Sequence, residues 1–420
     1  MRMKFNKSSQ LLLVSAASLL VAGLMTACTS LTVDFVFVAS SRAAGSNNYG
    51  EIDIFEVNSE SGHMRQIPAS PVPSNGRNPV AEAVSTDFAN LFVVNQDDNT
   101  IVQFVIGNDG KLYPFNTVNT PGVFPLAIAA NATNLFVVDT YQPLPSCSTA
   151  APCAGSIAVF PLAAGGSASS APCAATVCIE PPATNAGISA SYWPLTLAGK
   201  SSSDVIVPTG VNVIHSGAYV YVSAYDSSVT PAIGYIFGFS VSAGGVLTPV
   251  AGSPFIAGVQ PSSIAGDPTG AYLYVTDFKN GKVLGYSISS ATGLLTALAG
   301  SPFPAGNQPS AIVIDPNPTY SYAYVVNSLD STVTAYSMSS GKLTSLGSFP
   351  TGLQPVAIGI DPSTSHFLYT ANFLGGNISG FELSATAGTL LEGQGSPFPA
   401  NALPTAIAAI PHNGVGAVVK

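Results

Sequence analysis

Two short sequence patterns each recur seven times along this 420-residue chain, and they limit what the chain can fold into. The first pattern is a proline followed three residues later by an apolar residue. It begins at Pro79, Pro125, Pro208, Pro261, Pro309, Pro355 and Pro404. The second is a run of alternating aromatic and β-branched residues. It occurs at 35–38, 91–95, 135–139, 219–222, 272–277, 322–327 and 367–372. Self-similarity with a period of about 48 residues predicts a repeat architecture.

Each period contains enough sequence for four strands. Turn signals such as Asp267-Pro268-Thr269-Gly270 separate the two patterns, and a third apolar run follows, as at 283–288. A fourth run ends in Gly-Ser-Pro-Phe at 300–303. Charged residues make up only 8% of the chain, which excludes a charge-laced helical bundle. The sequence therefore predicts an all-β protein, a seven-bladed β-propeller of four-stranded antiparallel blades.

The two ends of the repeat region complement each other. The first blade begins at Phe35 with its second strand, whereas Pro404 to Ile410 offers an innermost strand with no blade after it. Pairing of these two segments closes the ring and covers edges that would otherwise promote aggregation. We therefore expect the C-terminal strand to join the N-terminal blade. The propeller would span 34–414, followed by a tail at 415–420.

One interval, between Pro125 and Pro208, is longer than the others. No second aromatic run lies inside it, so residues 141–207 are predicted to be an insertion in the third blade and not an eighth blade. The segment holds four cysteines, Cys147, Cys153, Cys173 and Cys178. We expect the disulfides Cys147–Cys153 and Cys173–Cys178, because the first pair falls on the upper face and the second begins on the opposite face. Zinc is the alternative, although the spacing is not C-x2-C.

The N-terminus predicts export. Residues 1–27 carry three basic residues and then an apolar run too short to cross a bilayer comfortably, which is typical of a signal peptide. The segment ends Leu24-Met25-Thr26-Ala27-Cys28, which resembles the bacterial lipobox. The resemblance implies lipidation of Cys28, a short anchor linker at 28–33, and a propeller held on a membrane in the cell envelope, periplasmic or surface-exposed. The alternative is an ordinary signal peptide with an incidental cysteine.

The formal net charge of −9 argues against one class of partner. An acidic chain with few Lys and Arg residues lacks the positive surface that holds phosphate backbones, so no nucleic-acid partner is expected. No cofactor and no metal site are expected either, since Asp97-Asp98-Asn99 is the sole candidate for calcium and lacks further oxygen ligands. The predicted assembly is a monomer.

The block Tyr272-Leu273-Tyr274-Val275-Thr276-Asp277, between Asp-Pro-x-Gly and Gly-Ser-Pro-Phe, resembles the YVTN-type repeat of the seven-bladed propeller lactonase family. That family includes 6-phosphogluconolactonase-like and muconate-cyclase-like proteins. The resemblance covers nearly the whole chain after residue 33. It implies Arg and His directly after the prolines of the innermost strands, facing the central channel. None of the fourteen residues at those positions is basic here.

Glu82 is the single charged residue in a predicted innermost strand. It is therefore the leading candidate for a catalytic base or a ligand-binding carboxylate in the channel. The alternative is a carboxylate that is merely hydrated there. The four histidines fall in turns of different blades and are not expected to meet.

Polar residues, most of them neutral amides, mark the predicted upper mouth of the channel. Four precede the prolines of innermost strands, and three end second strands: Asn78, Gln260, Gln308, Gln354, Asp277, Asn327 and Asn372. Amides both donate and accept hydrogen bonds, which suits a carbohydrate, a peptide or another neutral polar ligand. Alternatively, these groups bond neighbouring backbone and hold the blades together. The sequence thus favours a lipid-anchored propeller that binds a ligand or a protein, with a lactonase-type hydrolase as the second hypothesis.

Overall fold

The computed structural model describes residues 32–44, 46–164, 176–197, 204–362, 366–400 and 403–412. These residues form thirty-three strands, β1 to β33, and no α-helix. They contain no helix long and apolar enough to cross a membrane. The predicted signal peptide, Cys28 and the tail at 415–420 lie outside them.

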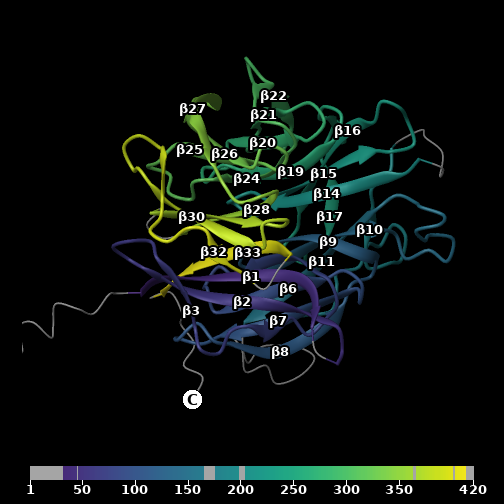
Figure 1. Ribbon diagram of the computed structural model, residues 1–420. Helices are drawn as coiled ribbons and strands as arrows, with labels where there is room; N and C mark the ends of the chain where they lie inside the picture. The colour runs from purple at the N-terminus through teal and green to yellow at the C-terminus, as the bar shows by residue number, and fades with distance from the viewer. Residues whose placement is uncertain are drawn as a thin grey trace, which may run out of the picture.

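The strands build seven antiparallel sheets arranged as a ring (Figure 1). Blade 1 contains β33 (Pro404–Pro411), β1 (Thr32–Ala44), β2 (Tyr49–Asn58), β3 (Met64–Gln66) and β4 (Val72–Pro73). Blade 2 contains β5 (Pro79–Val84), β6 (Asn90–Asn95), β7 (Thr100–Ile106) and β8 (Leu112–Asn119). Blade 3 contains β9 (Val123–Ala130), β10 (Asn134–Tyr141), β11 (Ser156–Ala164), β12 (Val177–Ile179) and β13 (Trp193–Pro194). Blade 4 contains β14 (Ile206–Val213), β15 (Tyr219–Asp226), β16 (Ile233–Val241), β17 (Leu247–Pro249) and β18 (Phe255–Ile256).

Blade 5 contains β19 (Pro261–Gly266), β20 (Tyr272–Asp277), β21 (Lys282–Ile288), β22 (Leu295–Ala297) and β23 (Phe303–Pro304). Blade 6 contains β24 (Pro309–Ile314), β25 (Tyr322–Asn327), β26 (Thr332–Ser339) and β27 (Lys342–Pro350). Blade 7 contains β28 (Pro355–Ile360), β29 (Phe367–Asn372), β30 (Asn377–Leu383), β31 (Leu390–Glu392) and β32 (Phe398–Pro399). In five blades the fourth strand is split into two short pieces that pair with different parts of the third strand.

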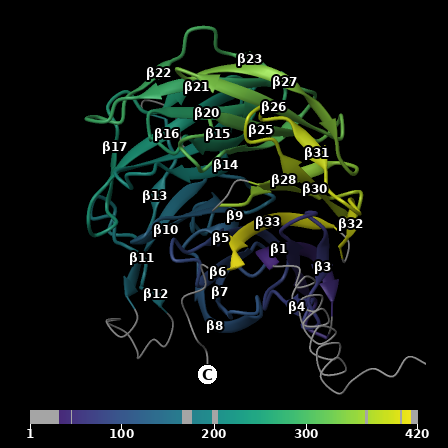
Figure 2. The same ribbon diagram turned by 90° about the vertical axis from the view of Figure 1, so that its left-hand side faces the viewer.

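The predicted ring closure is confirmed. Strand β33 pairs antiparallel with β1, and Ile407 lies opposite Val38 in the register. Figure 2 shows the yellow C-terminal strand β33 beside the purple N-terminal strand β1. Blade 1 therefore combines the two ends of the repeat region, and its innermost strand comes from the C-terminal end.

Hydrophobic seams between adjacent blades form the core. The second strands are buried almost completely because both of their faces pack on a neighbouring blade, and this explains why they lack a polar face. The largest fully buried side chains include Tyr221, Tyr274, Tyr324 and Tyr369, at the same position of successive second strands. The low charge of the sequence follows from this arrangement, since few strand positions reach solvent.

Each innermost strand has an irregularity directly after its conserved proline. In all seven blades the pairing with the second strand shifts there, so that the residue after the proline has no cross-strand partner. These are the positions at which the lactonase resemblance implies basic residues. We call the face on which these strands begin, and on which the turns between second and third strands lie, the upper face.

Candidate functional site

In three blades the residue after the recurring proline bonds to the next blade. Ser262 donates its hydroxyl to the Pro309 carbonyl at 2.5 Å, and Ser310 donates to the Pro355 carbonyl at 2.8 Å. Thr405 donates to the Pro79 carbonyl at 2.7 Å and lies 3.1 Å from the Ala39 carbonyl. These hydroxyls therefore link blade 5 to blade 6, blade 6 to blade 7 and blade 1 to blade 2 around the channel.

Glu82 points away from the predicted site. In six blades the equivalent position, three residues after the proline, holds Ile or Val. The neighbouring Val84 packs into the seam between blades 1 and 2, and the Glu82 carboxyl lies in that seam beside the backbone of Ala39. Burial raises the pKa of Glu82 to about 8, while the contact with Ala39 opposes the rise. Both carboxyl oxygens are buried, and apart from this contact with Ala39 neither has a polar partner among the described residues. A catalytic role for Glu82 stays a prediction, and this orientation does not support it.

The residues that end the second strands are used inside the blades. Asp277 accepts the backbone N–H groups of Val259 and Gln260 at 3.0 and 3.1 Å. Asn327 accepts the N–H of Gly306 and donates to Thr332 and Thr334. Asn372 donates to Asn377 and Ser379. All three are buried. Asp277 and Asn327 fix the segment that leads into the innermost strand, whereas Asn372 bonds to the third strand of its own blade. This matches the alternative in which these groups hold the blades together.

The four residues before the prolines share one backbone geometry. The carbonyls of Asn78, Gln260, Gln308 and Gln354 each accept an N–H from the next turn at 2.9 Å. The side chain of Asn78 donates to Gln96 and Asp97, in a turn where Arg77 also pairs with Asp98. Gln308 and Gln354 line a pocket of about 240 Å³ between blades 6 and 7. The structure thus brings two of the four together in one pocket.

A larger pocket, of about 460 Å³, lies beside the insertion of blade 3. Its lining residues come from the loop after β10, the segment after β13 and the start of β14. They are Gln142, Leu144, Ser146, Cys147, Cys153, Ala154, Thr196, Leu197, Asp204 and Ile206. The sequence did not indicate this pocket, because its walls come from segments that lie outside the repeat pattern.

Local contacts explain how these segments meet. The predicted Cys147–Cys153 disulfide is present, with Cα atoms 5.4 Å apart, and it holds the loop after β10. The N–H of Gly155 donates to the Ile206 carbonyl at 2.8 Å, and the Gly155 carbonyl accepts the N–H of Leu195 at 2.9 Å. A Cβ at Gly155 would come within 2.5 Å of Pro208, so a glycine is required at this close approach. Cys178 is also disulfide-bonded, and Cys173 lies outside the described residues.

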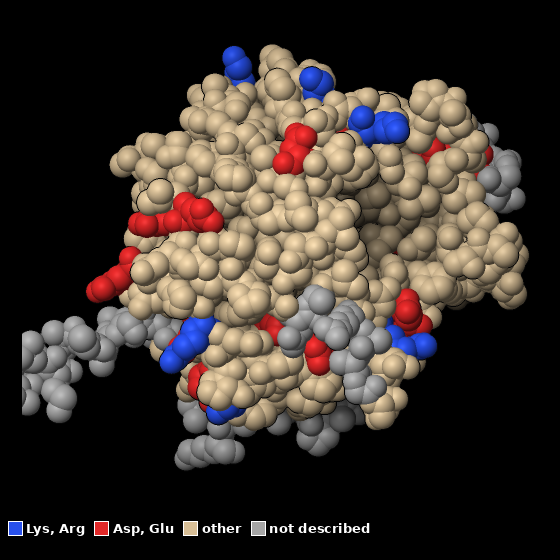
Figure 3. Space-filling model, in the orientation of Figure 1, with Lys and Arg blue, Asp and Glu red and all other residues tan. Residues whose placement is uncertain are grey.

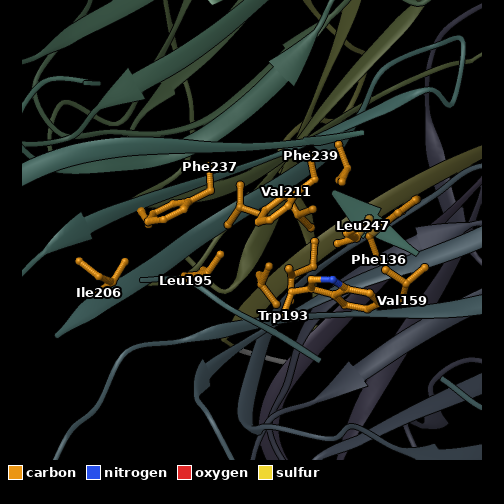
Figure 4. Packing of buried hydrophobic residues seen from close by; sticks show 14 of the residues in the cluster. Phe136, Val159, Trp193, Leu195, Ile206, Val211, Phe237, Phe239 and Leu247 are labelled. Atoms are coloured by element: carbon orange, nitrogen blue, oxygen red, sulfur yellow. The ribbon is translucent and has the colours of Figure 1, made fainter. Parts of the chain in front are cut away.

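Trp193 anchors the insertion beneath this pocket. It packs with Leu195, Ile206 and Phe237 in the seam between blades 3 and 4, where it is 5% exposed (Figure 4). The single Trp of the chain thus binds the inserted segment to the blades.

Asp204 is the one carboxylate among the described residues that line this pocket. Its Oδ2 atom is buried and has no hydrogen-bond partner among the described residues. The next residue, Val205, is held in place because its carbonyl accepts both the N–H and the hydroxyl of Ser227, at 3.0 and 3.1 Å. Ser146 and Thr196 add hydroxyl groups, and no lining residue is cationic. The arrangement offers one carboxylate and several neutral donors and acceptors to a small polar molecule.

Burial raises the pKa of one carboxyl in blade 3. Asp139 ends β10, and burial raises its pKa to about 7, although hydrogen bonds from Thr120 and the N–H of Gly122 oppose the rise. The face drawn in Figure 3 carries scattered single charges and no extended basic patch. Among the described residues no group of three or more His, Cys, Asp and Glu side chains could hold a metal ion.

Comparison with known proteins supports the fold. Residues 301–396 match the family model described as "Lactonase, 7-bladed beta-propeller". No curated protein sequence matches the chain. A periplasmic gluconolactonase of Pseudomonas aeruginosa is 17% identical, with a TM-score of 0.66, 90% of this chain and 99% of that chain covered. A Bacteroides fragilis protein provisionally named 6-phosphogluconolactonase is 19% identical, with a TM-score of 0.67 and coverages of 91% and 99%.

A protein named for a different activity has a similar propeller fold. Hydrazine synthase of Kuenenia stuttgartiensis is 15% identical to this chain, with a TM-score of 0.52 and coverages of 83% and 95%. At these identities the likeness shows the fold alone, and activity has to be argued from the pockets.

Proposed function

Because this chain has the fold of the seven-bladed lactonase propellers and matches their family model over residues 301–396, we propose that it is a lactonase-type hydrolase. Its substrate would be an uncharged sugar lactone, bound in the pocket beside the insertion of blade 3. The observation that carries this proposal is the Asp204 carboxylate, which lines that pocket and has an oxygen without a partner.

The chemistry requires one general base and neutral hydrogen-bond donors. Asp204 would take a proton from a water molecule, whose oxygen then attacks the lactone carbonyl carbon. The ring carbon–oxygen bond breaks in the resulting tetrahedral intermediate, and the ring oxygen receives the proton from Asp204. One lactone and one water thus give one hydroxy acid. The hydroxyls of Ser146 and Thr196 would bind the sugar or the developing oxyanion.

Charge argues for an uncharged substrate. A sugar phosphate needs a cationic clamp such as Arg. The described lining of the pocket has none, and the positions after the conserved prolines hold no basic residue. Within the fold group, the Pseudomonas aeruginosa relative is a gluconolactonase, and gluconolactone carries no phosphate.

A lactone panel tests the proposal. We expect the purified protein to hydrolyse glucono-δ-lactone in a pH-stat assay much faster than 6-phosphoglucono-δ-lactone. No rate above the buffer reaction with any lactone would exclude the hydrolase. Hydrolysis of the phosphorylated lactone alone would overturn the assignment of an uncharged substrate.

A second function is favoured by a different observation. The pocket between blades 6 and 7 is lined by amides, hydroxyls and leucines, and no charged residue lines it. It suits a protein that binds a ligand without changing it, exported and held at the cell envelope through Cys28 as the sequence predicts. Labelling of the exported protein with a fatty-acid probe, lost in Cys28→Ser, would test the anchor.

A further inference from the structure

The pocket between blades 6 and 7 has an unusual composition for this protein. Three leucines line it, Leu329, Leu353 and Leu374, and their exposed fractions are 64%, 63% and 65%. The polar part of the lining is Gln308, Gln354, Ser328 and Ser331. Single exposed leucines are common on protein surfaces, whereas three that share one pocket indicate a binding surface.

The repeat itself shows that the fold does not require these leucines. Leu329 and Leu374 occupy the second position of the turn between second and third strands. In blades 2 and 5 the same position is Asp97 and Lys279. Leu353 stands two residues before the conserved proline, where blade 2 has Arg77 and blade 6 has Asn307. Charged and polar residues therefore satisfy the same backbone geometry, and the leucines are specific to this seam.

The pocket is held by main-chain contacts. Ser328 donates both its N–H and its hydroxyl to the Gln308 carbonyl at 2.9 Å. The N–H of Gly375 donates to the Leu353 carbonyl at 3.0 Å, which ties the loop before β28 to the turn that carries Leu374. The backbone of Gln308 and Gln354 lies in the left-handed region, with φ of 53° and 52°. Their side-chain amides form no hydrogen bond to any other described residue, so the amides are free for a ligand.

We propose that this pocket binds a neutral single-chain amphiphile, with a hydroxylated head on the Gln308 and Gln354 amides and an aliphatic chain across the three leucines. Both the polar and the apolar residues that line the pocket favour this class of ligand. Amides and hydroxyls recognise an uncharged head, and the absence of Lys, Arg, Asp and Glu from the lining disfavours a charged one. The volume of about 240 Å³ limits what the pocket can hold to a small head and a short chain. The site is separate from the Asp204 pocket and does not depend on the proposed hydrolase.

Calorimetric titration with alkyl glucosides below their micelle concentrations tests this site. The probes are methyl, hexyl, heptyl and octyl β-D-glucoside. Burial of one methylene contributes about 0.8 kcal/mol, so we expect about fourfold tighter binding for each methylene that enters the pocket. Octyl glucoside should bind, and methyl glucoside should not bind measurably. Equal affinity for all four probes, or no binding by octyl glucoside, would overturn the proposal.

Matched variants locate the site. Leu353→Ser and Leu374→Ser should each weaken octyl glucoside binding about three- to tenfold, and Gln308→Ala with Gln354→Ala should weaken it further. Leu391→Ser is the control, because Leu391 is 67% exposed in the same blade and lies on β31 outside the pocket. Equal loss in the control would show nonspecific adsorption and overturn the site. Sedimentation that shows a dimer abolished by Leu353→Ser would assign the leucines to a second copy instead.

Discussion

Tyr369 of blade 7 donates its hydroxyl to the Asp34 carboxyl of blade 1 at 3.1 Å, across the closure of the ring. The equivalent tyrosines Tyr221, Tyr274 and Tyr324 donate to glycine carbonyls in the next blade. Burial, together with the nearby charge of Asp361, raises the pKa of Asp34 to about 8, and the Tyr369 hydrogen bond opposes that rise. At the closure of the ring this tyrosine thus has a titratable acceptor, whereas in three other seams the acceptor is a neutral carbonyl.

This difference predicts a pH-dependent cost for Tyr369→Phe. The hydrogen bond favours ionised Asp34, so its loss should destabilise the protein more at pH 9 than at pH 6. We expect a decrease of about 1 to 3 kcal/mol in the free energy of unfolding at pH 9, measured by urea denaturation. Tyr324→Phe should cost a similar amount at both values. The same pH profile in both variants would contradict a special role for Asp34.

Glu82 should make the protein less stable as the pH rises. Its pKa in the folded state is about 8, above the ordinary value of 4.5, so the folded state holds a proton that the unfolded state has lost between these values. Below about pH 4.5 Glu82 does not lower the free energy of unfolding. Between about pH 4.5 and pH 8 it lowers the free energy of unfolding by about 1.4 kcal/mol per pH unit. Glu82→Gln should remove this slope and be more stable than the parent at pH 8. Denaturation at several pH values measures this slope. Glu60→Gln is the control, because Glu60 is exposed in a turn. A parent and variant with the same slope would show that Glu82 does not titrate in this range.

The sequence predicted the ring because the ring depends on local patterns. The conserved prolines, the aromatic runs and the complementary ends each indicate a strand or a turn within a few residues, so the seven blades and the β33–β1 pairing could be inferred. The direction of the Glu82 side chain could not be inferred, because the irregularity after Pro79 decides which seam the side chain enters. Asp204 was missed because its pocket forms from loops that have no periodicity.

The hydroxyl of Thr405 should contribute to ring closure. It contacts the carbonyls of Ala39 and Pro79, which lie in blade 1 and blade 2. Thr405→Val keeps the shape and removes the donor, so we expect a loss of about 1 to 2 kcal/mol in the free energy of unfolding. Thr209→Val is the comparison, since Thr209 contacts Ser223 within its own blade. A smaller loss at Thr405 than at Thr209 would argue against a contribution from the contact between blades.

The Cys147–Cys153 disulfide should matter for the pocket more than for the ring. It closes a short loop on the upper face and lines the Asp204 pocket. The double substitution Cys147→Ser and Cys153→Ser removes the loop constraint. In the chain-entropy model this lowers the free energy of unfolding by about 2 kcal/mol. We expect the pair of substitutions to raise KM for the lactone and to leave the far-ultraviolet circular dichroism unchanged. An unchanged KM would show that this wall does not contact the substrate.

The most direct test of the hydrolase is the rate of Asp204→Asn with glucono-δ-lactone. A general base contributes about 10² to 10⁴ in rate, so kcat/KM should fall at least about a hundredfold while the variant unfolds at the same temperature as the parent. Asp330→Asn is the matched control, because Asp330 is an exposed carboxylate of an upper-face turn in blade 6, away from this pocket. We expect this loss in Asp204→Asn and the parent rate in Asp330→Asn. Full activity in Asp204→Asn would contradict the role of Asp204 as the general base.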